Sequence, residues 1–150
     1  MRDVMREAQG VTTVEFALVI PVLLLLVIGM LDFGRALNAQ IVLASASQEG
    51  AHYAVLHPTA APSAINDAAR ARTAPLAADA IGVTAEYYNG ATFVPWPSAG
   101  IPASSPTPGP VLVRVSVTYP WDAVTFVVGN FVQPAGPRTL SSSAVMEARR

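Results

Sequence analysis

The residues whose types and spacing could support chemistry stand at the front of the chain. A short charged leader, MRDVMREAQG, ends in Gly10, which is followed directly by Val11 and, a few residues later, by Glu15. A glycine has no Cβ, so an extended backbone at this point can enter a tight protease site. Cutting after Gly10 would free the α-amine of Val11, and a free α-amine is protonated at neutral pH. The bond between Gly10 and Val11 is therefore a candidate cleavage site.

The carboxylate of Glu15 could form an ion pair with this amine. In a filament, the Val11 amine of an incoming subunit could meet a neighbour's Glu15, an attraction of roughly 4 kcal/mol at about 4 Å and an effective dielectric of about 20. Any other stagger would leave a charge unpaired in hydrocarbon, so such a pair would also set the axial register. Pairing within one chain is the alternative, because Val11 and Glu15 lie one helical turn apart.

These residues sit at the head of a strongly apolar segment. Residues 16–31, FALVIPVLLLLVIGML, carry no charge, and Glu15 is the only interruption in the wider window 11–31. A helix over 11–31 would rise about 31 Å, close to the roughly 30 Å hydrocarbon core of a bilayer. The sequence predicts a transmembrane helix over 11–31, with a kink at Pro21, which cannot hydrogen-bond the Ala17 carbonyl.

The flanking charges predict the orientation of this span. Arg2 and Arg6 precede it, whereas only Arg35 follows it before Arg70. Arginine accumulates on the cytoplasmic side of membrane helices. We therefore expect residues 1–10 in the cytoplasm and the C-terminal domain outside it.

Helical periodicity continues beyond the membrane segment. The pattern predicts an amphipathic extension over 32–57, giving one helix of roughly 45 residues that ends at His57 because Pro58 disfavours a helical residue before it. Its predicted apolar positions are Phe33, Leu37, Ile41, Ala44, Ala51 and Val55, and its polar positions are Arg35, Asn38, Ser45, Glu49 and His52.

Residues 58–150 predict a small extracytoplasmic domain. A second helix, capped by Ser63 and bent or split at Pro75, should run to about Ala80. VTAEYY and ATFVPW flank Asn89-Gly90, a pair typical of a tight hairpin turn with two positive φ angles. Alternation of apolar and polar residues over 111–119 predicts the clearest strand, and Leu140 to Glu147 a last one that pairs with it. The predicted fold class is α+β, with a long N-terminal helix, a short helix and a small antiparallel sheet.

Other chemistry has little support in the sequence. The chain has no cysteine, which excludes disulfides and thiolate sites, and a net charge of −1, which argues against nucleic-acid binding. Glu49 and His52 have the Glu-x-x-His spacing found in metal-binding helix bundles, but the motif occurs once and no further carboxylate cluster accompanies it. Ser98 lacks the first glycine of a nucleophile elbow. We expect no enzymatic activity, no catalytic residue, no cofactor and no metal, and we expect Tyr53, Trp96, Tyr119 and Trp121 to pack in the core or on the sheet.

Several segments together resemble the TadE-like pseudopilins of the tight-adherence (Flp) pilus, a branch of the type IV pilin superfamily. Gly10, Val11 and Glu15 fit the prepilin cleavage pattern. VEFALVIPVLLLLVIGMLDFGRAL, from Val14 to Leu37, is similar to the helix of the family, and residues 49–54 fit its later EGA-x-YA stretch. VRVSVTYPW and the closing TLSSSAVMEARR are similar to its terminal strands. At His52 the sequence departs from the arginine that is frequent in the family.

The resemblance implies a minor pseudopilin cut by an aspartyl prepilin peptidase and engaged in pilus assembly or adhesion. Its partners would then be the membrane, the prepilin peptidase, other Tad/Flp pilins and pseudopilins, and the pilus assembly platform, and its location the bacterial inner membrane or the pilus. Two other classes stay open. One is a secreted or membrane-anchored binding protein, because Ala44-Ser45-Ala46 has the small-x-small form of a signal-peptidase site, although this lies far beyond the apolar run. The other is a single-pass protein with an extracytoplasmic enzyme or sensor domain.

Overall fold

The computed structural model describes residues 2–101, 111–123 and 138–148, and of residues 2–12 only the backbone. The chain divides into two compact units. Unit 1 comprises Met1–Arg35 and Asp122–Gly136, and unit 2 comprises Ala36–Trp121 and Pro137–Arg150. The first helix passes from one unit into the other, and the described strands belong to unit 2.

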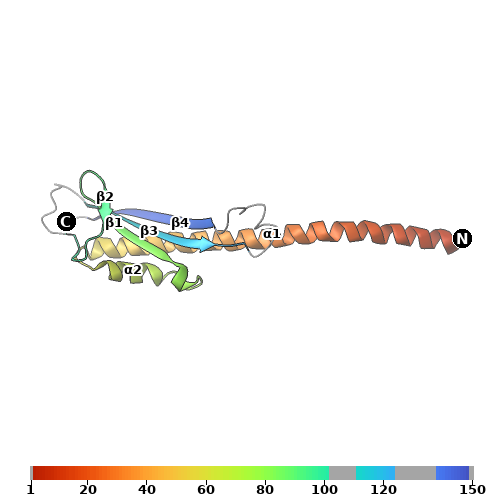
Figure 1. Ribbon diagram of the computed structural model, residues 1–150, viewed down its shortest axis with the longest axis horizontal. Coiled ribbons are helices and arrows are strands. Elements are labelled where there is room, and N and C mark those ends of the chain that lie inside the picture. The colour runs from red at the N-terminus through yellow and green to blue at the C-terminus, as the bar shows by residue number, and fades with distance from the viewer. Residues whose placement is uncertain (1, 102–110, 124–137, 149–150) are drawn as a thin grey trace. The chain divides into compact units, whose positions relative to one another are not determined.

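Helix α1 spans Arg2–Leu56 and continues through Pro21 (Figure 1). It ends one residue before His57, as Pro58 predicts, and the His57 amide donates to the Tyr53 carbonyl at 2.9 Å in the last turn. The helix is longer than expected because the leader residues up to Gly10 are helical as well. Methionine, arginine, glutamate, alanine and glutamine favour helix, and no proline interrupts this stretch.

The buried face of α1 agrees with the predicted one at Ala51 and Val55, which lie in or against the core, but differs from it nearer the membrane segment. Phe33, Leu37 and Ile41 are 64%, 49% and 65% exposed, although their spacing predicts an apolar face. Small residues make the contact with the sheet instead, because they allow helix and strands to approach closely. The buried residues of α1 in unit 2 are Ala39, Leu43, Ala46, Ser47, Gly50, Ala51 and Ala54.

A short helix and a 3-10 turn follow. Helix α2 covers Pro62–Arg70 and buries Ile65 and Ala69, and the 3-10 turn η1 covers Ala78–Ala80. The predicted helix to about Ala80, bent or split at Pro75, is therefore wrong beyond Arg70, where only the 3-10 turn η1 follows. The Ser63 cap is also wrong: Ala61 is the N-cap residue and Pro62 occupies the first helical turn, where its missing N–H costs nothing.

Four antiparallel strands form one sheet in the order β2-β1-β3-β4. The two long strands pair one residue to one, from Val111 opposite Ala148 to Trp121 opposite Arg138. This confirms both the alternating strand and its predicted pairing with the last segment. The strands are β1 (Gly82–Tyr88), β2 (Phe93–Pro95), β3 (Val111–Trp121) and β4 (Arg138–Ala148).

The hairpin between β1 and β2 is present, but its turn is not the predicted two-residue type. Asn89 keeps a negative φ, and Gly90 alone has a positive one, at 99°. The Asn89 side chain accepts hydrogen bonds from the amides of Ala91 and Thr92 at 3.0 and 2.9 Å, so it holds a longer loop closed. This Asx geometry competes with the tight turn that the Asn-Gly pair favours.

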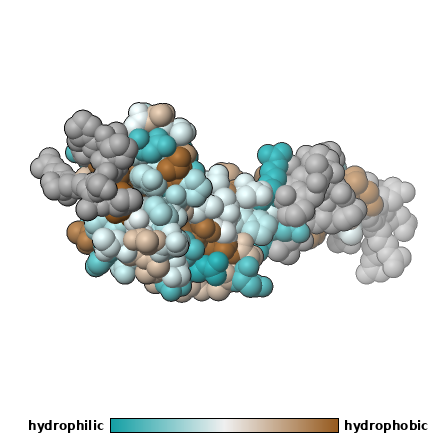
Figure 2. Space-filling view, turned by 60° about the vertical axis from the view of Figure 1, so that its left-hand side comes forward, coloured by the Kyte–Doolittle hydropathy of each residue, from teal (hydrophilic) through white to brown (hydrophobic). Residues whose placement is uncertain are grey.

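The core lies between one face of the sheet, α1 and α2 (Figure 1). Val113, Val115 and Val117 of β3 are completely buried, and they alternate with half-buried residues on the opposite face. Trp96 and Trp121 are also buried, while Tyr53 and Tyr119 pack at the margin of the core, so the aromatic prediction is confirmed. On the side seen in Figure 2, the described surface of this region is mostly polar, with separate apolar spots.

Candidate functional site

The candidate cleavage residues lie within α1. The backbone of Gly10 and Val11 is helical, and the side chains of residues 2–12 are not among those described. A protease that binds an extended substrate must therefore unwind this turn, and glycine weakens a helix by about 1 kcal/mol relative to alanine. Cleavage after Gly10 remains a prediction.

Glu15 is exposed on the same helix, between Val14 and Phe16, which are 61% and 65% exposed. Among the residues that the structure describes, no ion pair involves Glu15. Its carboxylate thus stands on an apolar helical surface without a charge partner from the described part of its own chain. The assembly role of Glu15 stays a prediction.

The apolar part of α1 is long enough to cross a membrane. The candidate span lies within Thr13–Leu56, and its most apolar window has a mean hydropathy of 2.8 and is 0% buried inside the protein. A core helix of a soluble protein would bury such a surface against its own fold. This helix fits a single-pass membrane anchor that is followed by a C-terminal domain. The helix is continuous through Pro21. Continuity alone does not distinguish a straight helix from a kinked one, so the kink at Pro21 stays a prediction.

A buried acid marks the end of the apolar run. Asp32 is only 3% exposed, and its carboxylate pairs with the Arg35 guanidinium at 3.3 Å, one turn further along α1. Because an acid beside an apolar run is usually an exposed flanking charge, the burial of Asp32 is a finding that only the structure gives.

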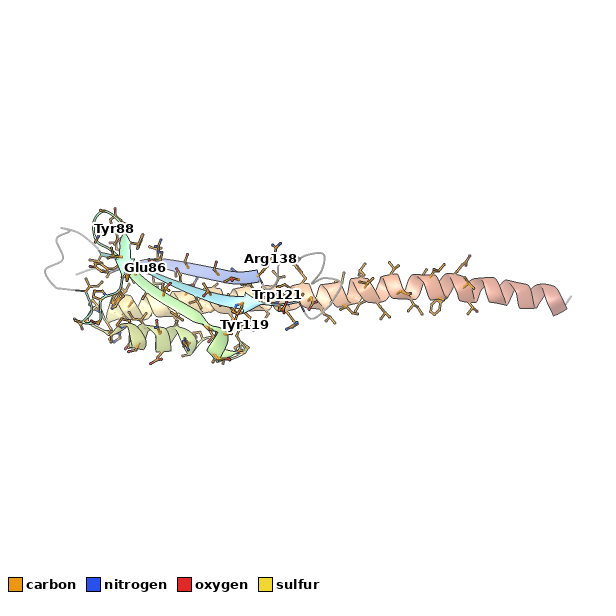
Figure 3. The ribbon with its side chains drawn as sticks, in the orientation of Figure 1. Glu86, Tyr88, Tyr119, Trp121 and Arg138 are labelled. Atoms are coloured by element: carbon orange, nitrogen blue, oxygen red, sulfur yellow. The ribbon has the colours of Figure 1, made fainter. Side chains whose placement is uncertain are left out.

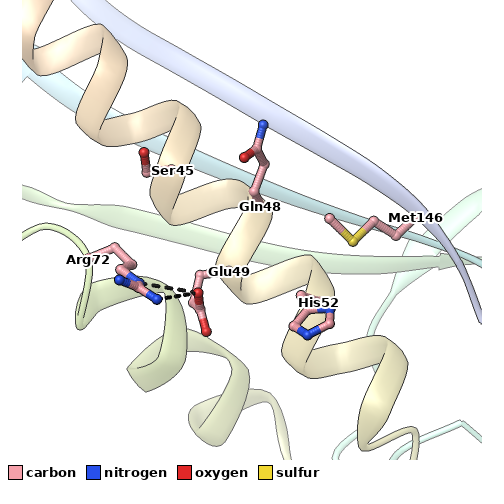
Figure 4. A pocket seen from close by; sticks show the side chains of 6 residues that line it. All are labelled: Ser45, Gln48, Glu49, His52, Arg72 and Met146. Atoms are coloured by element: carbon pink, nitrogen blue, oxygen red, sulfur yellow. Dashed lines mark hydrogen bonds and ion pairs between the residues drawn. The ribbon is translucent and has the colours of Figure 1, made fainter.

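A shallow pocket of about 390 Å³ lies in unit 2 beside the C-terminal part of α1 (Figure 4). Glu49 and Arg72 meet in it: both Nε and Nη2 of Arg72 donate to Glu49 Oε2, at 3.1 and 2.9 Å. The side chains of Glu49 and Arg72 are 37% and 60% exposed, and solvent-exposed ion pairs contribute about 0–1 kcal/mol to the stability of a fold. The lining residues are Ser45, Gln48, Glu49, His52, Arg72 and Met146.

Glu49 and His52 thus line a common pocket, but the Glu49 carboxylate is engaged by an arginine. Within the part of the chain that the structure describes, no group of three or more histidine, cysteine or acidic side chains is placed to hold a metal ion. The main feature of the pocket is consequently the surface ion pair between Glu49 and Arg72, which connects α1 to the segment after α2.

The EGA-x-YA stretch has a packing explanation. A Cβ built on Gly50 would lie 2.9 Å from Val115 Cγ1 and 3.1 Å from Ala69 Cβ, so the helix, the sheet and α2 all meet at this residue. Ala51 and Ala54 are completely buried next to it. The motif therefore reads as a contact surface of α1 with the sheet and α2, with Glu49 at its solvent edge.

Comparison with known families bears on this same helix. Residues 10–52 match the family model TadE, described as TadE-like protein. The resemblance drawn from the sequence is thereby confirmed for this TadE-like segment, which covers the candidate cleavage site, Glu15, the apolar span and most of the Gly50 contact. No curated protein and no solved structure gives a significant match to the chain.

The TadE-like segment thus consists of two successive parts of one helix, which differ in size and burial of their side chains. Its N-terminal part is apolar and exposed, and its C-terminal part is small and buried against the domain. The cleavage site and the role of Glu15 stay predictions, and the partner of Glu49 could not be read from the sequence. Arg72 lies beyond the segment, and only the fold brings the two residues together.

Proposed function

We propose that this chain is a minor, non-enzymatic pilin-like subunit of the tight-adherence (Flp) pilus system. In this proposal a prepilin peptidase cuts after Gly10, residues 11–31 hold the mature chain in the cytoplasmic membrane, and the domain lies outside it. The observation that carries the proposal is the match of residues 10–52 to the TadE-like family. Its partners are the prepilin peptidase, the other pilins and pseudopilins, and the assembly platform.

The exposed surface of α1 supports a role in assembly. Beyond the apolar run, Phe33, Leu37 and Ile41 still present apolar side chains at one-turn spacing, each about half exposed or more. Large apolar patches on a protein surface mark sites of interaction. Helices of other subunits could cover this row once the chain leaves lipid for an assembly.

Glu15 gives the proposal its mechanism. A carboxylate near hydrocarbon is costly, by about 2.5–3.5 kcal/mol at the centre of a membrane helix and less near its end. Pairing with the Val11 amine of another subunit would remove this cost only at one axial stagger. Glu15 therefore acts on assembly, whereas Gly10 governs cleavage.

The test separates these two steps. Glu15→Ala should insert at least as well as the wild type and still be cleaved, yet it should fail to support pili. Glu15→Asp keeps the charge with a shorter reach and should be intermediate. Glu49→Ala, which removes a carboxylate from the same helix outside the apolar run, is the matched control and should leave piliation unchanged.

Crosslinking decides between an intermolecular and an intramolecular role. The chain has no cysteine, so Val14→Cys introduces a single crosslinking site next to Glu15. Loss of crosslinks to other pilin-like subunits in the Glu15→Ala background supports the proposal. Wild-type crosslinks and piliation with Glu15→Ala would show that Glu15 is an interfacial carboxylate without an assembly role.

A further inference from the structure

Polar groups without an internal partner converge on the pocket beside α1 (Figure 4). The hydroxyl of Ser45, the amide of Gln48 and the ring nitrogens of His52 make no hydrogen bond to the described part of the chain, although all three side chains line the pocket. The pocket belongs wholly to unit 2, and Met146 supplies its apolar wall. A concave surface with a few convergent polar groups is the usual form of a small-molecule site.

The ion pair in this pocket leaves one part of each charged group free. Arg72 donates from Nε and Nη2, and both donors converge on Oε2 of Glu49. Within the ranges that the structure describes, Glu49 Oε1 and Arg72 Nη1 have no hydrogen-bond partner. A two-pronged pair would occupy both carboxylate oxygens. This pair instead keeps one acceptor and one donor for a ligand.

Another ion pair, between Glu86 and Arg114, shows why the pocket matters. It has the same geometry, with Nε and Nη2 of Arg114 at 2.7 and 2.6 Å from Glu86 Oε2. The guanidinium of Arg114, however, lies over the ring of Phe93, 4.1 Å from its centroid, and the side chain is 34% exposed. The side chain of Arg72 is 60% exposed and borders the pocket, so a small molecule can reach it.

Charge decides which class of ligand fits. A simple anion would meet the guanidinium of Arg72, whose charge Glu49 already balances, and a simple cation would meet a carboxylate that Arg72 already balances. An α-amino acid carries a carboxylate and an ammonium group on the same carbon atom. It can therefore bind the free donor and the free acceptor together through charge-assisted hydrogen bonds, which are the strong ones.

We propose that this pocket binds a free α-amino acid with an aliphatic side chain. The ligand carboxylate accepts from Arg72 Nη1, the ammonium group donates to Glu49 Oε1, and the side chain lies against Met146. The volume of about 390 Å³ is near the lower end of the range for ligand pockets, roughly 300–1,000 Å³, which suits a molecule of this size. The inference goes beyond the proposed function and does not depend on it, because every lining residue belongs to unit 2.

The experiment uses the full chain in micelles with isotope-labelled methionine methyl groups. Met146 is the only methionine of unit 2, so its signal reports on the pocket, whereas Met30 in the apolar run reports on partition into the micelle. Leucine should shift the Met146 signal to saturation, with a dissociation constant on the order of 1 mM, and leave Met30 unchanged. A Met146 shift that does not saturate, or an equal shift at Met30, would overturn the proposal.

Matched ligands test which groups are recognised. N-acetylleucine lacks the ammonium charge, and leucine amide lacks the carboxylate. Each should bind about tenfold more weakly than leucine, or weaker still, because each loses a charge-assisted hydrogen bond. Glycine, which has no side chain to cover Met146, should also bind more weakly. If N-acetylleucine or leucine amide binds as tightly as leucine, the site recognises a single charge and the proposal is wrong; equal binding of glycine would contradict the aliphatic preference.

Substitutions in the ion pair should reverse these preferences. Glu49→Ala removes the acceptor and frees Arg72, so N-acetylleucine should bind more tightly than leucine amide. Arg72→Ala frees Glu49, so leucine amide should bind more tightly than N-acetylleucine. Both changes remove a largely exposed pair, so we expect the domain to stay folded.

Arg138→Ala is the matched control for the loss of an exposed charge. Arg138 begins β4 at the end of the sheet that carries Trp121 and Tyr119, away from Met146 (Figure 3). This variant should bind leucine as the wild type does and keep the wild-type order of ligands. A preference for leucine that survives both Glu49→Ala and Arg72→Ala would refute the assigned contacts.

Discussion

Gly50 offers the sharpest perturbation of the packing between α1 and the sheet. In an exposed helix, glycine to alanine stabilises by about 1 kcal/mol. At Gly50 the added Cβ would lie 2.9 Å from Val115 Cγ1 and 3.1 Å from Ala69 Cβ, which is too close for both contacts. Val115 and Ala69 are completely buried, so neither can turn away into solvent.

The magnitude follows from these opposing effects. Overpacking a tight core costs about 1–3 kcal/mol, and the gain in helix propensity offsets about 1 kcal/mol of it. We expect Gly50→Ala to lower the free energy of unfolding by about 1 kcal/mol, and Gly50→Val, which adds two further methyl groups, by about 3 kcal/mol or more. For a domain of about 100 residues, 1 kcal/mol corresponds to a shift of about 4–8 °C in melting temperature.

Gly34→Ala is the matched control on the same helix. Among the described residues, no atom outside the helix's own backbone lies within 4 Å of a Cβ built at Gly34, so the substitution should leave the melting temperature unchanged or raise it. The assay is thermal unfolding of the full chain in micelles, followed by the fluorescence of Trp96 and Trp121, both of which are buried. If Gly50→Ala is as stable as Gly34→Ala, close packing at Gly50 does not constrain the fold and our explanation of the EGA-x-YA stretch is wrong.

Three further predictions concern the core, the surface ion pair and the cleavage site. Leu43→Ala removes a completely buried side chain and should cost about 2–5 kcal/mol of stability in the same melting assay; a loss below about 1 kcal/mol would contradict the assigned core. Arg72→Ala breaks a largely exposed pair with Glu49 and should cost about 1 kcal/mol or less, with the difference from wild type shrinking at high salt. Gly10→Leu should leave the precursor uncut on immunoblots, since added bulk blocks an extended backbone at the scissile bond, and cleavage at the normal rate would show that Gly10 has no such role.

The long elements could be predicted from the sequence because their signals are local. The apolar run and the alternation over 111–119 are read from neighbouring residues, and the structure confirms the helix, the strand and the α+β fold class. Pro58 also predicted the end of α1 to within one residue. Hydrophobic periodicity is strongest in such long segments.

Other features depend on tertiary contacts and escaped the sequence. Phe33 and Ile41 have the spacing of a buried face, yet the sheet selects the small residues on another side of the helix, which permit closer packing. The Asn89 side chain closes a longer loop where the Asn-Gly pair alone favours a two-residue turn. Arg72 pairs with Glu49 only because α2 returns the chain to α1.

The N-terminal residue of the mature protein is the direct test of cleavage after Gly10. The full chain should be purified from the membranes of its own cells, and its N-terminal peptide should be sequenced by mass spectrometry. We expect a chain that begins at Val11, with the apolar span retained. A chain that begins at Gln40 or Ser47 would indicate cleavage beyond the span by a signal peptidase, and it would contradict the assignment as a pilin-like subunit.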